Sequence, residues 1–289
     1  MGGSALIVEG GGMRGIFSAG VLDAFLELDF DPFRIYVGVS AGACNLSSQV
    51  AGQYQRNFRI YTTQMVRREF ISVRKFLGGG NYMDLDWLWE TFQREDPLDV
   101  VAAEKATRTK IFIIVCTSVT TGRAVYLRPR ADTWLNQIKA SSSVPLFYRR
   151  ACHVGGERLM DGGVADPLPV QEAIRQGARE VVVIRSRPLG YVKSAGLETC
   201  LTSLLFKRHA ELSGALRRQA LVYRNAVSLI ENPPEGITIH HITPARPLRT
   251  SRTSQDLDAL KSDYQLGHEE GTAAVLQIRS GRVHASTRG

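Results

Sequence analysis

Two patterns of apolar residues alternate along the first 185 positions of the chain. Short continuous apolar runs predict strands that are buried on both faces, since such strands have no polar side. The predicted strands are residues 5–8, 34–39, 111–117 and 180–184, and each contains such a run. Segments with helical spacing or helix stop signals lie between them, at residues 16–28, 41–52, 132–142 and 169–176. Strands and helices in alternation are typical of an α/β fold with a central, mostly parallel sheet.

The remaining elements are predicted from turn signals and periodicity. Residues 124–127 read as a hairpin partner of the 111–117 strand across Thr121 and Gly122, and residues 237–242 as a last strand. Helices are expected near residues 85–92, 199–224 and 255–278. Because we find no repeat, low-complexity block or linker, we expect one domain over residues 1–289, with a motif-bearing core at about 5–185 and a C-terminal extension at about 190–289.

Composition and charge narrow the class of protein. With 44% apolar and 22% charged residues, the chain is typical of a soluble globular protein. Its net charge of +8 favours anionic partners such as phospholipid headgroups, although a soluble protein that is merely basic is the simpler explanation. Cys44, Cys116, Cys152 and Cys200 show no Cys-x-x-Cys spacing, which argues against a zinc or redox site and fits a reducing compartment. Neither a signal peptide nor a membrane span is predicted, so we expect a cytoplasmic protein.

A candidate nucleophile follows the second predicted strand. Gly38, Val39, Ser40, Ala41 and Gly42 form a Gly-x-Ser-x-Gly motif between a strand and a helix, the context in which this motif exposes its serine on a tight turn. The helix start favours negative charge that develops beside the serine. The motif alone is equally compatible with a tight strand-to-helix turn without chemistry.

A glycine-rich loop joins the first strand to the first helix. Its residues are Gly10, Gly11, Gly12, Met13, Arg14 and Gly15. Such a loop presents backbone N–H groups to a ligand oxygen, and we interpret it as an oxyanion hole. It also matches the dinucleotide-binding Gly-x-Gly-x-x-Gly pattern, but the second strand ends at Ser40 without the carboxylate that holds a ribose, and no phosphate-loop lysine follows.

The general base is less obvious. Six histidines are scattered along the chain, and none lies in a motif. Asp161 precedes Gly162 and Gly163 after a predicted strand, so its carboxylate is uncrowded. Taken alone, this segment reads as an ordinary Asp-Gly turn.

The three segments in this order resemble the patatin-like phospholipase family. Residues 140–147, Ala-Ser-Ser-Ser-Val-Pro-Leu-Phe, are similar to another block of that family, and the likeness covers about residues 5–185. A narrower likeness is to a bacterial cytosolic subgroup of patatin-like esterases, whereas Asp166 departs from the Asn of plant patatins. The resemblance implies a three-layer α/β/α patatin-like fold and a Ser-Asp dyad without histidine. Ser40 would then be the nucleophile and Asp161 the proton acceptor, with no metal or cofactor.

The implied substrate is a phospholipid, lysophospholipid or related acyl ester, and nucleic acid is not expected. A basic margin on the 199–224 segment is compatible with peripheral contact with an anionic membrane, although a core-packing helix is the simpler interpretation. Trp87, Trp89 and Phe92 are candidates for an acyl pocket or for the core. An acyltransferase with the same acyl-enzyme and a non-catalytic lipid-binding protein remain alternatives.

Overall fold

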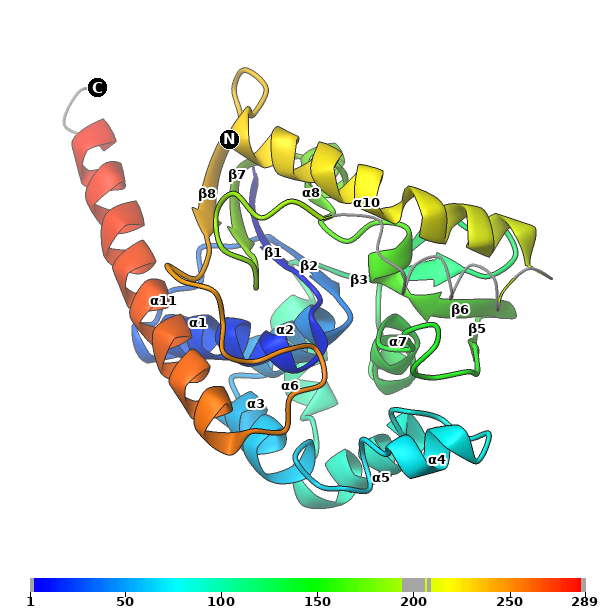
Figure 1. Ribbon diagram of the computed structural model, residues 1–289. Helices are drawn as coiled ribbons and strands as arrows, with labels where there is room; N and C mark the ends of the chain where they lie inside the picture. Colours follow the sequence, from blue (N-terminus) through cyan, green and yellow to red (C-terminus); the bar gives the residue numbers. More distant parts are fainter. Residues whose placement is uncertain (1–2, 194–205, 207–208, 287–289) are drawn as a thin grey trace.

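One mixed sheet organises the computed structural model, which describes residues 3–193, 206 and 209–286 (Figure 1). Its strands are hydrogen-bonded in the order β5 (Cys152–Val154), β6 (Glu157–Asp161), β3 (Ile111–Ser118), β2 (Ile35–Val39), β1 (Gly3–Val8), β7 (Ala178–Ile184) and β8 (Thr238–Ile242), and β4 (Ala124–Leu127) pairs with β3. The run from β3 to β8 is parallel throughout, whereas β4, β5 and β6 are joined by antiparallel pairings. The predicted α/β class and mostly parallel sheet are confirmed.

Helices cover both faces of this sheet (Figure 1). On one face pack α1 (Gly15–Glu27), α2 (Ala41–Val50), α5 (Leu85–Glu95), α7 (Trp134–Ser141) and α11 (Leu257–Ser286). On the other face pack α8 (Val170–Arg175) and α10 (Ala210–Glu231). Within β1, Leu6 belongs to the first apolar cluster and Ile7 to the second, since successive side chains point to opposite faces. This explains the continuous apolar runs in the sequence.

Short elements complete the chain. They are η1 (Gly12–Arg14), α3 (Arg56–Arg59), η2 (Ile60–Gln64), α4 (Val73–Leu77), α6 (Val100–Thr107) and η3 (Gly162–Val164). The predicted 124–127 hairpin is present, but α6 and β5 were not predicted. Residues 199–205 of the predicted 199–224 helix lie outside the described residues, and α10 continues to Glu231. Helix α11 extends beyond the predicted end at Ile278 and packs along α1.

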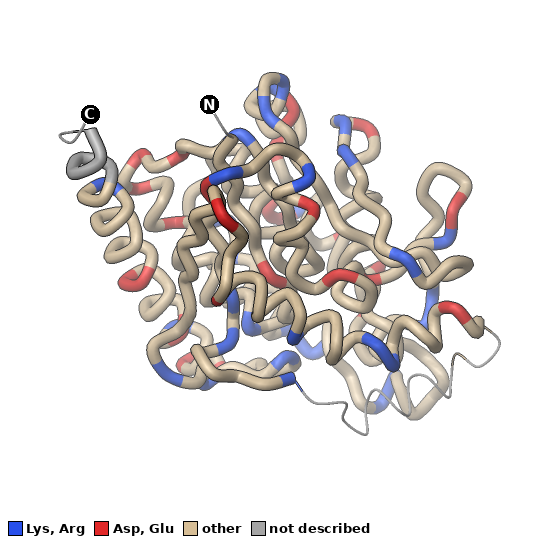
Figure 2. Tube along the Cα trace, turned by 90° about the horizontal axis from the view of Figure 1, so that it is seen from above, with Lys and Arg blue, Asp and Glu red and all other residues tan. Residues whose placement is uncertain are grey.

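Helix α10 packs one face of its amphipathic pattern into the protein. Leu212, Leu216 and Tyr223 are buried, with Tyr223 in the cluster beneath the sheet. This apolar face of the described part of the segment therefore packs in the core, while peripheral contact with an anionic membrane stays a prediction. Figure 2 shows basic and acidic residues dispersed over many parts of the described trace, so the positive charge of the described residues is not concentrated on one helix.

The register of β3 explains how two distant segments meet. At Val115, β3 pairs with β2 on one edge and with β4 on the other. At the next residue, Cys116, β3 still pairs with β4 on the same edge. On the other edge the pairing with β2 has ended, and Asp161 of β6 pairs with Cys116 instead. Asp161 therefore occupies the place beside β3 that Ser40 would fill if β2 continued straight.

Candidate active site

Ser40 lies on a strained turn between β2 and α2. Its backbone has φ 53° and ψ −125°, a conformation that residues with a side chain rarely adopt. The following Gly42 is required by close packing, because a Cβ there would lie 2.2 Å from the carbonyl oxygen of Val8. The Ser40 N–H donates to Ser141 Oγ at 2.8 Å, and that hydroxyl donates to the Val115 carbonyl at 2.6 Å. The turn is thus tied to the neighbouring strand through a serine side chain.

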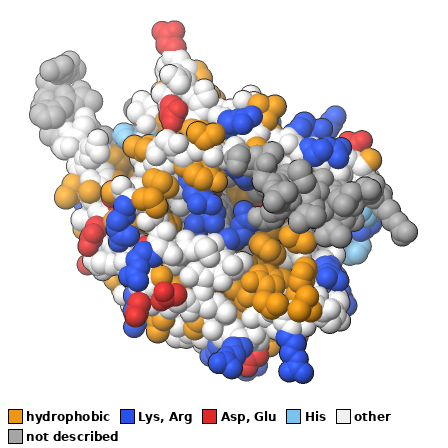
Figure 3. All heavy atoms as spheres, viewed as in Figure 1, with side chains coloured by type: hydrophobic (Ala, Val, Ile, Leu, Met, Phe, Trp, Pro, Cys, Tyr) orange, Lys and Arg blue, Asp and Glu red, His pale blue; other side chains and the backbone are white. Residues whose placement is uncertain are grey.

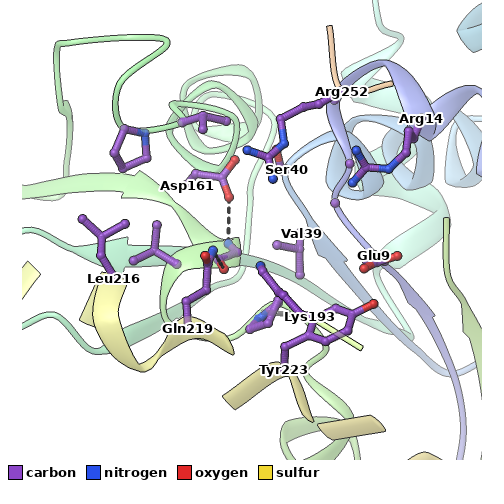
Figure 4. Close-up of a pocket in the computed structure, with 18 residues that line it drawn as sticks. Glu9, Arg14, Val39, Ser40, Asp161, Lys193, Leu216, Gln219, Tyr223 and Arg252 are labelled. Carbon is purple, nitrogen blue, oxygen red and sulfur yellow. Dashed lines mark hydrogen bonds between the residues drawn. The ribbon is translucent and has the colours of Figure 1, made fainter. Parts of the chain in front are cut away.

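Asp161 lies beside Ser40 with one carboxylate oxygen uncommitted (Figure 4). Oδ1 accepts a hydrogen bond of 2.7 Å from the Gly163 N–H. Oδ2 is buried and has no hydrogen-bond partner in the part of the chain that the structure describes. The nearby Ser40 hydroxyl favours the charged carboxylate, although its geometry falls short of a hydrogen bond to Oδ2. An unsatisfied buried acceptor next to a hydroxyl is poised to take a proton.

Burial sets the proton affinity of this carboxylate. It raises the pKa of Asp161 above the ordinary value for an aspartate. The Ser40 hydroxyl, the Gly163 N–H and the positive charges of Arg252 and Lys193 oppose that shift. Burial therefore makes this carboxylate a stronger base than an aspartate in water, while the neighbouring cations limit the rise in its pKa.

Only some backbone N–H groups of the glycine-rich loop are available to bind a ligand, because the others donate hydrogen bonds within the described part of the protein. The N–H of Met13 donates to the Arg252 carbonyl, that of Arg14 to Gly11, and that of Gly15 to Gly12. Met13, Arg14 and Gly15 therefore do not supply free backbone donors, contrary to the inclusion of the whole loop in the predicted oxyanion hole. Among the described residues, no acceptor is found for the N–H groups of Gly10, Gly11 and Gly12.

Ser40 lies where two cavities of different character meet. Both cavities include Gly12, Ser40, Val144 and Arg252 in their walls. The apolar cavity encloses about 890 Å³, its open mouth included, and is lined by side chains such as Phe70, Leu88, Trp89, Phe92 and Ile138. The polar cavity is lined on its far side by Glu9, Arg14, Lys193, Gln219 and Tyr223 (Figure 4).

Several lining residues escaped prediction from the sequence. Lys193 follows β7, Gln219 and Tyr223 belong to α10, and Arg252 lies on the loop before α11. The Gln219 amide donates to the Gly163 carbonyl at 2.5 Å, so α10 touches the Asp-Gly-Gly segment directly. None of the four lies in a recognisable motif. They line the cavity because the segments after β7 and β8 fold back against the site.

Other singled-out residues lie elsewhere. Asp166 accepts a hydrogen bond of 2.8 Å from the Tyr126 hydroxyl and faces a separate cavity. Trp89 and Phe92 line the apolar cavity, whereas Trp87 only packs against the core beside it. No histidine among the described residues lines either cavity at Ser40. Asp161 is therefore the candidate base for Ser40.

The search for membrane spans gave a negative result. In the described parts of the chain, every helix is too short or too polar to cross a bilayer.

Comparisons with known proteins add an independent line of evidence. The family model for patatin-like phospholipase matches residues 6–174, and that for a domain of unknown function (DUF6363) matches residues 209–280. Uncharacterized protein YjjU of Escherichia coli (strain K12) is 38% identical over an alignment of 273 residues, which covers 91% of this chain and 74% of that protein. Among solved structures, VipD from Legionella pneumophila gives a TM-score of 0.46 at 10% identity, over 96% of this chain and 67% of that chain. The first model spans the glycine loop, the serine turn and the Asp-Gly-Gly segment.

Proposed function

Because this chain belongs to the patatin-like phospholipase family, we propose that it is a serine hydrolase that cleaves the carboxylic ester bonds of acyl lipids. Family membership supports lipid acyl hydrolysis as the general activity. The proposal assigns the nucleophile to Ser40 and the proton acceptor to Asp161. The observation that carries it is a strained serine beside a buried aspartate whose Oδ2 lacks a partner, at the meeting point of an apolar and a basic cavity.

In the first half of the reaction, Ser40 Oγ attacks the ester carbonyl carbon while Asp161 Oδ2 takes the hydroxyl proton. The carbonyl oxygen becomes an oxyanion and accepts hydrogen bonds from the free N–H groups of Gly11 and Gly12. Such donors typically lower the barrier by about 3–4 kcal/mol each. Collapse of the tetrahedral intermediate breaks the bond to the alcohol, which leaves with the proton from Asp161. The acyl group then remains on Ser40.

In the second half, a water molecule gives its proton to Asp161 as its oxygen attacks the acyl carbon. Collapse of the second intermediate releases the carboxylic acid, and the proton returns from Asp161 to Ser40. The raised pKa of Asp161 suits this role, because a more basic carboxylate accepts the proton at lower cost.

The apolar cavity is the proposed site for the acyl chain. Its wall includes Ser40 and the apolar side chains of Leu88, Phe92 and Ile138. Each methylene removed from water there contributes about 0.8 kcal/mol, so chain length is expected to affect kcat/KM strongly.

The test is hydrolysis of a chain-length series of p-nitrophenyl esters and of a phospholipid by the native protein, Ser40→Ala and Asp161→Asn. We expect both variants to lose at least about 1000-fold in kcat, because the two groups act as one unit. A fluorophosphonate probe is expected to label the native protein at Ser40 and to leave Ser40→Ala unlabelled.

Asp166→Asn is the matched control, since it removes a partly buried carboxylate that lies five positions further along the chain and faces a different cavity. It is expected to keep activity within a few fold of native. Full activity of folded Ser40→Ala would overturn the proposal. Loss of activity in Asp166→Asn equal to that in Asp161→Asn would overturn the choice of base.

A further inference from the structure

One wall of the apolar cavity contains a buried cation. Arg56 of α3 lines the cavity together with apolar side chains such as Ile60 and Leu98, and it is only 5% exposed. Its Nε donates to the Asp96 carbonyl at 2.9 Å, and its Nη1 donates to the Ser48 hydroxyl at 2.9 Å. In the part of the chain that the structure describes, its Nη2 has neither a hydrogen-bond partner nor an ion pair. This nitrogen of the guanidinium is therefore available to a ligand in the cavity.

The protein does not neutralise the charge of Arg56. Both acceptors of its hydrogen bonds are uncharged, and the carboxylate of Asp96 is engaged by Arg59 Nε at 3.0 Å and by the Gln64 amide at 2.7 Å. Burial lowers the pKa of Arg56 to about 10, so the guanidinium is still charged at neutral pH. Lysine and arginine side chains at the surface, as in Figure 3, are solvated by water and need no counter-ion. A buried guanidinium without a paired anion is costly.

Arg56 also has a structural role, which does not require its charge to face a cavity. The Asp96 carbonyl lies at the C-cap of α5, and a cation at a helix C-terminus is favourable. However, the Asp96 carbonyl and the Ser48 hydroxyl each need only an N–H group, which a neutral side chain also supplies. Helix capping therefore accounts for two of the N–H groups of Arg56 and leaves Nη2 unexplained.

Helix α2 sets the separation between Ser40 and this cation. Ser40, Cys44 and Ser48 are spaced by four residues, so they lie on one face of the helix. At a rise of 1.5 Å per residue, Ser40 and Ser48 are about 12 Å apart along the helix axis. Cys44 lines the cavity between them, where burial raises the pKa of its thiol and the charge of Arg56 opposes that rise. Arg56 therefore acts on the cavity about two helical turns from Ser40.

We infer that the apolar cavity binds acyl chains that end in a carboxylate, with the distal carboxylate held by Arg56 and the ester carbonyl at Ser40. The inference rests on the proposed function and names its substrate class, which is monoesters of long-chain dicarboxylic acids. A carboxylate suits Arg56 because it accepts charge-assisted hydrogen bonds from a guanidinium and supplies the missing negative charge. An extended chain advances about 1.2 Å per bond, so about ten bonds reach from Ser40 to Arg56.

The first experiment measures kcat/KM of the native protein on pairs of p-nitrophenyl esters that differ only at the chain end. Each pair consists of an alkanoate ester and the monoester of the dicarboxylic acid of equal length, at six and at ten carbon atoms. At six carbons the carboxylate should lower kcat/KM at least about tenfold, because it lies in apolar surroundings short of Arg56. At ten carbons the carboxylate ester should equal or exceed the alkanoate ester. Rejection at ten carbons as strong as at six, or equal acceptance at both lengths, would overturn the inference.

The second experiment removes the cation. In Arg56→Met, the ratio of kcat/KM on the two ten-carbon esters should shift against the carboxylate by about 10–100-fold. Arg59→Met is the matched control, because Arg59 lies on the same helix and pairs with Asp96, yet is 49% exposed and lies outside the cavity wall. It should leave that ratio unchanged. A purely structural role predicts equal losses on both esters in Arg56→Met, which would contradict the inference. The length dependence of the native protein decides the question if Arg56→Met fails to fold.

Binding to Ser40→Ala, followed by calorimetry, tests the subsite without turnover. Adding Arg56→Met should weaken binding of monomethyl decanedioate relative to methyl decanoate by at least about tenfold. Free decanoate distinguishes a chain-end carboxylate from a free acid that binds in reverse. If decanoate binding depends on Arg56 and binding of the decanedioate monoester does not, the site takes free fatty acids and the inference is wrong. Absence of Ser40-dependent hydrolysis of any ester removes the proposed function, whereas the difference in binding still decides the inference.

Discussion

The strained backbone at Ser40 makes a quantitative prediction about stability. Residues held at such φ and ψ values cost about 1–3 kcal/mol, and a residue without Cβ avoids most of that cost. Replacement of Ser40 by alanine keeps the strain, and replacement by glycine releases it. Both variants lose the hydroxyl, so the difference between them reports mainly on the backbone.

Two other contributions to the free energy of unfolding favour alanine over glycine at any buried position. Glycine gains about 0.5–1 kcal/mol of conformational freedom in the unfolded chain, and the lost methyl group removes about 0.8 kcal/mol of burial. Ser47 in α2 provides the matched control, because it is fully buried and lies in regular helix. There, Ser47→Gly is expected to be less stable than Ser47→Ala by about 1–2 kcal/mol.

At position 40 the strain opposes these terms, so we expect Ser40→Gly to match or exceed Ser40→Ala in stability. The difference between the two positions should be about 1–3 kcal/mol, measured by urea denaturation of all four variants. If glycine is penalised at position 40 as much as at position 47, within about 0.5 kcal/mol, the turn is not strained and the argument is wrong.

Three further predictions follow from packing and charge. Gly267→Ala should destabilise by about 1–3 kcal/mol, since its Cβ would lie 2.0 Å from the carbonyl oxygen of Phe17, whereas Gly281→Ala on the same helix meets nothing within 4 Å and should be neutral or stabilising in urea denaturation. Burial raises the pKa of Asp23 to about 6, so the contribution of Asp23 to stability falls as pH rises from about 4 to 6. Between these two pH values, the free energy of unfolding measured by urea denaturation should therefore change by up to about 3 kcal/mol less in Asp23→Asn than in the native protein. Ile138→Trp should fill the apolar cavity and lower kcat/KM for long-chain esters about tenfold or more while sparing p-nitrophenyl acetate; an unchanged chain-length profile would place the acyl chain elsewhere.

The sequence predicted the sheet well because its signal is local. Residues 5–8 and 181–184 are apolar at every position, and a parallel strand that is covered on both faces requires that pattern. The short strand β5 carries no such signal, since its three residues are partly or fully exposed. Helix α6 buries Ala103 alone, so its periodicity is equally weak.

The candidate site was predictable only where a motif marked it. Ser40 and Asp161 lie in motifs, and the structure brings them together, while their catalytic roles stay predictions. Arg252 and Lys193 reach the polar cavity from segments whose local sequence gives no sign of it. Their placement depends on the path of the chain after β7 and β8, which is a tertiary property. Likewise, the engagement of the Met13 N–H by Arg252 could not be inferred from the loop alone.

The register of the sheet offers a physical reason why the proposed Ser40–Asp161 dyad would need no third residue. In a Ser-His-Asp triad, the third residue holds the imidazole in its tautomer and orientation. Asp161 needs no such orienting residue, because β6 fixes its backbone opposite Cys116 and the Gly163 N–H fixes its Oδ1. The remaining oxygen, Oδ2, is left for Ser40. A base that the β-ladder positions directly is rigid, and burial supplies the basicity that an aspartate in water lacks.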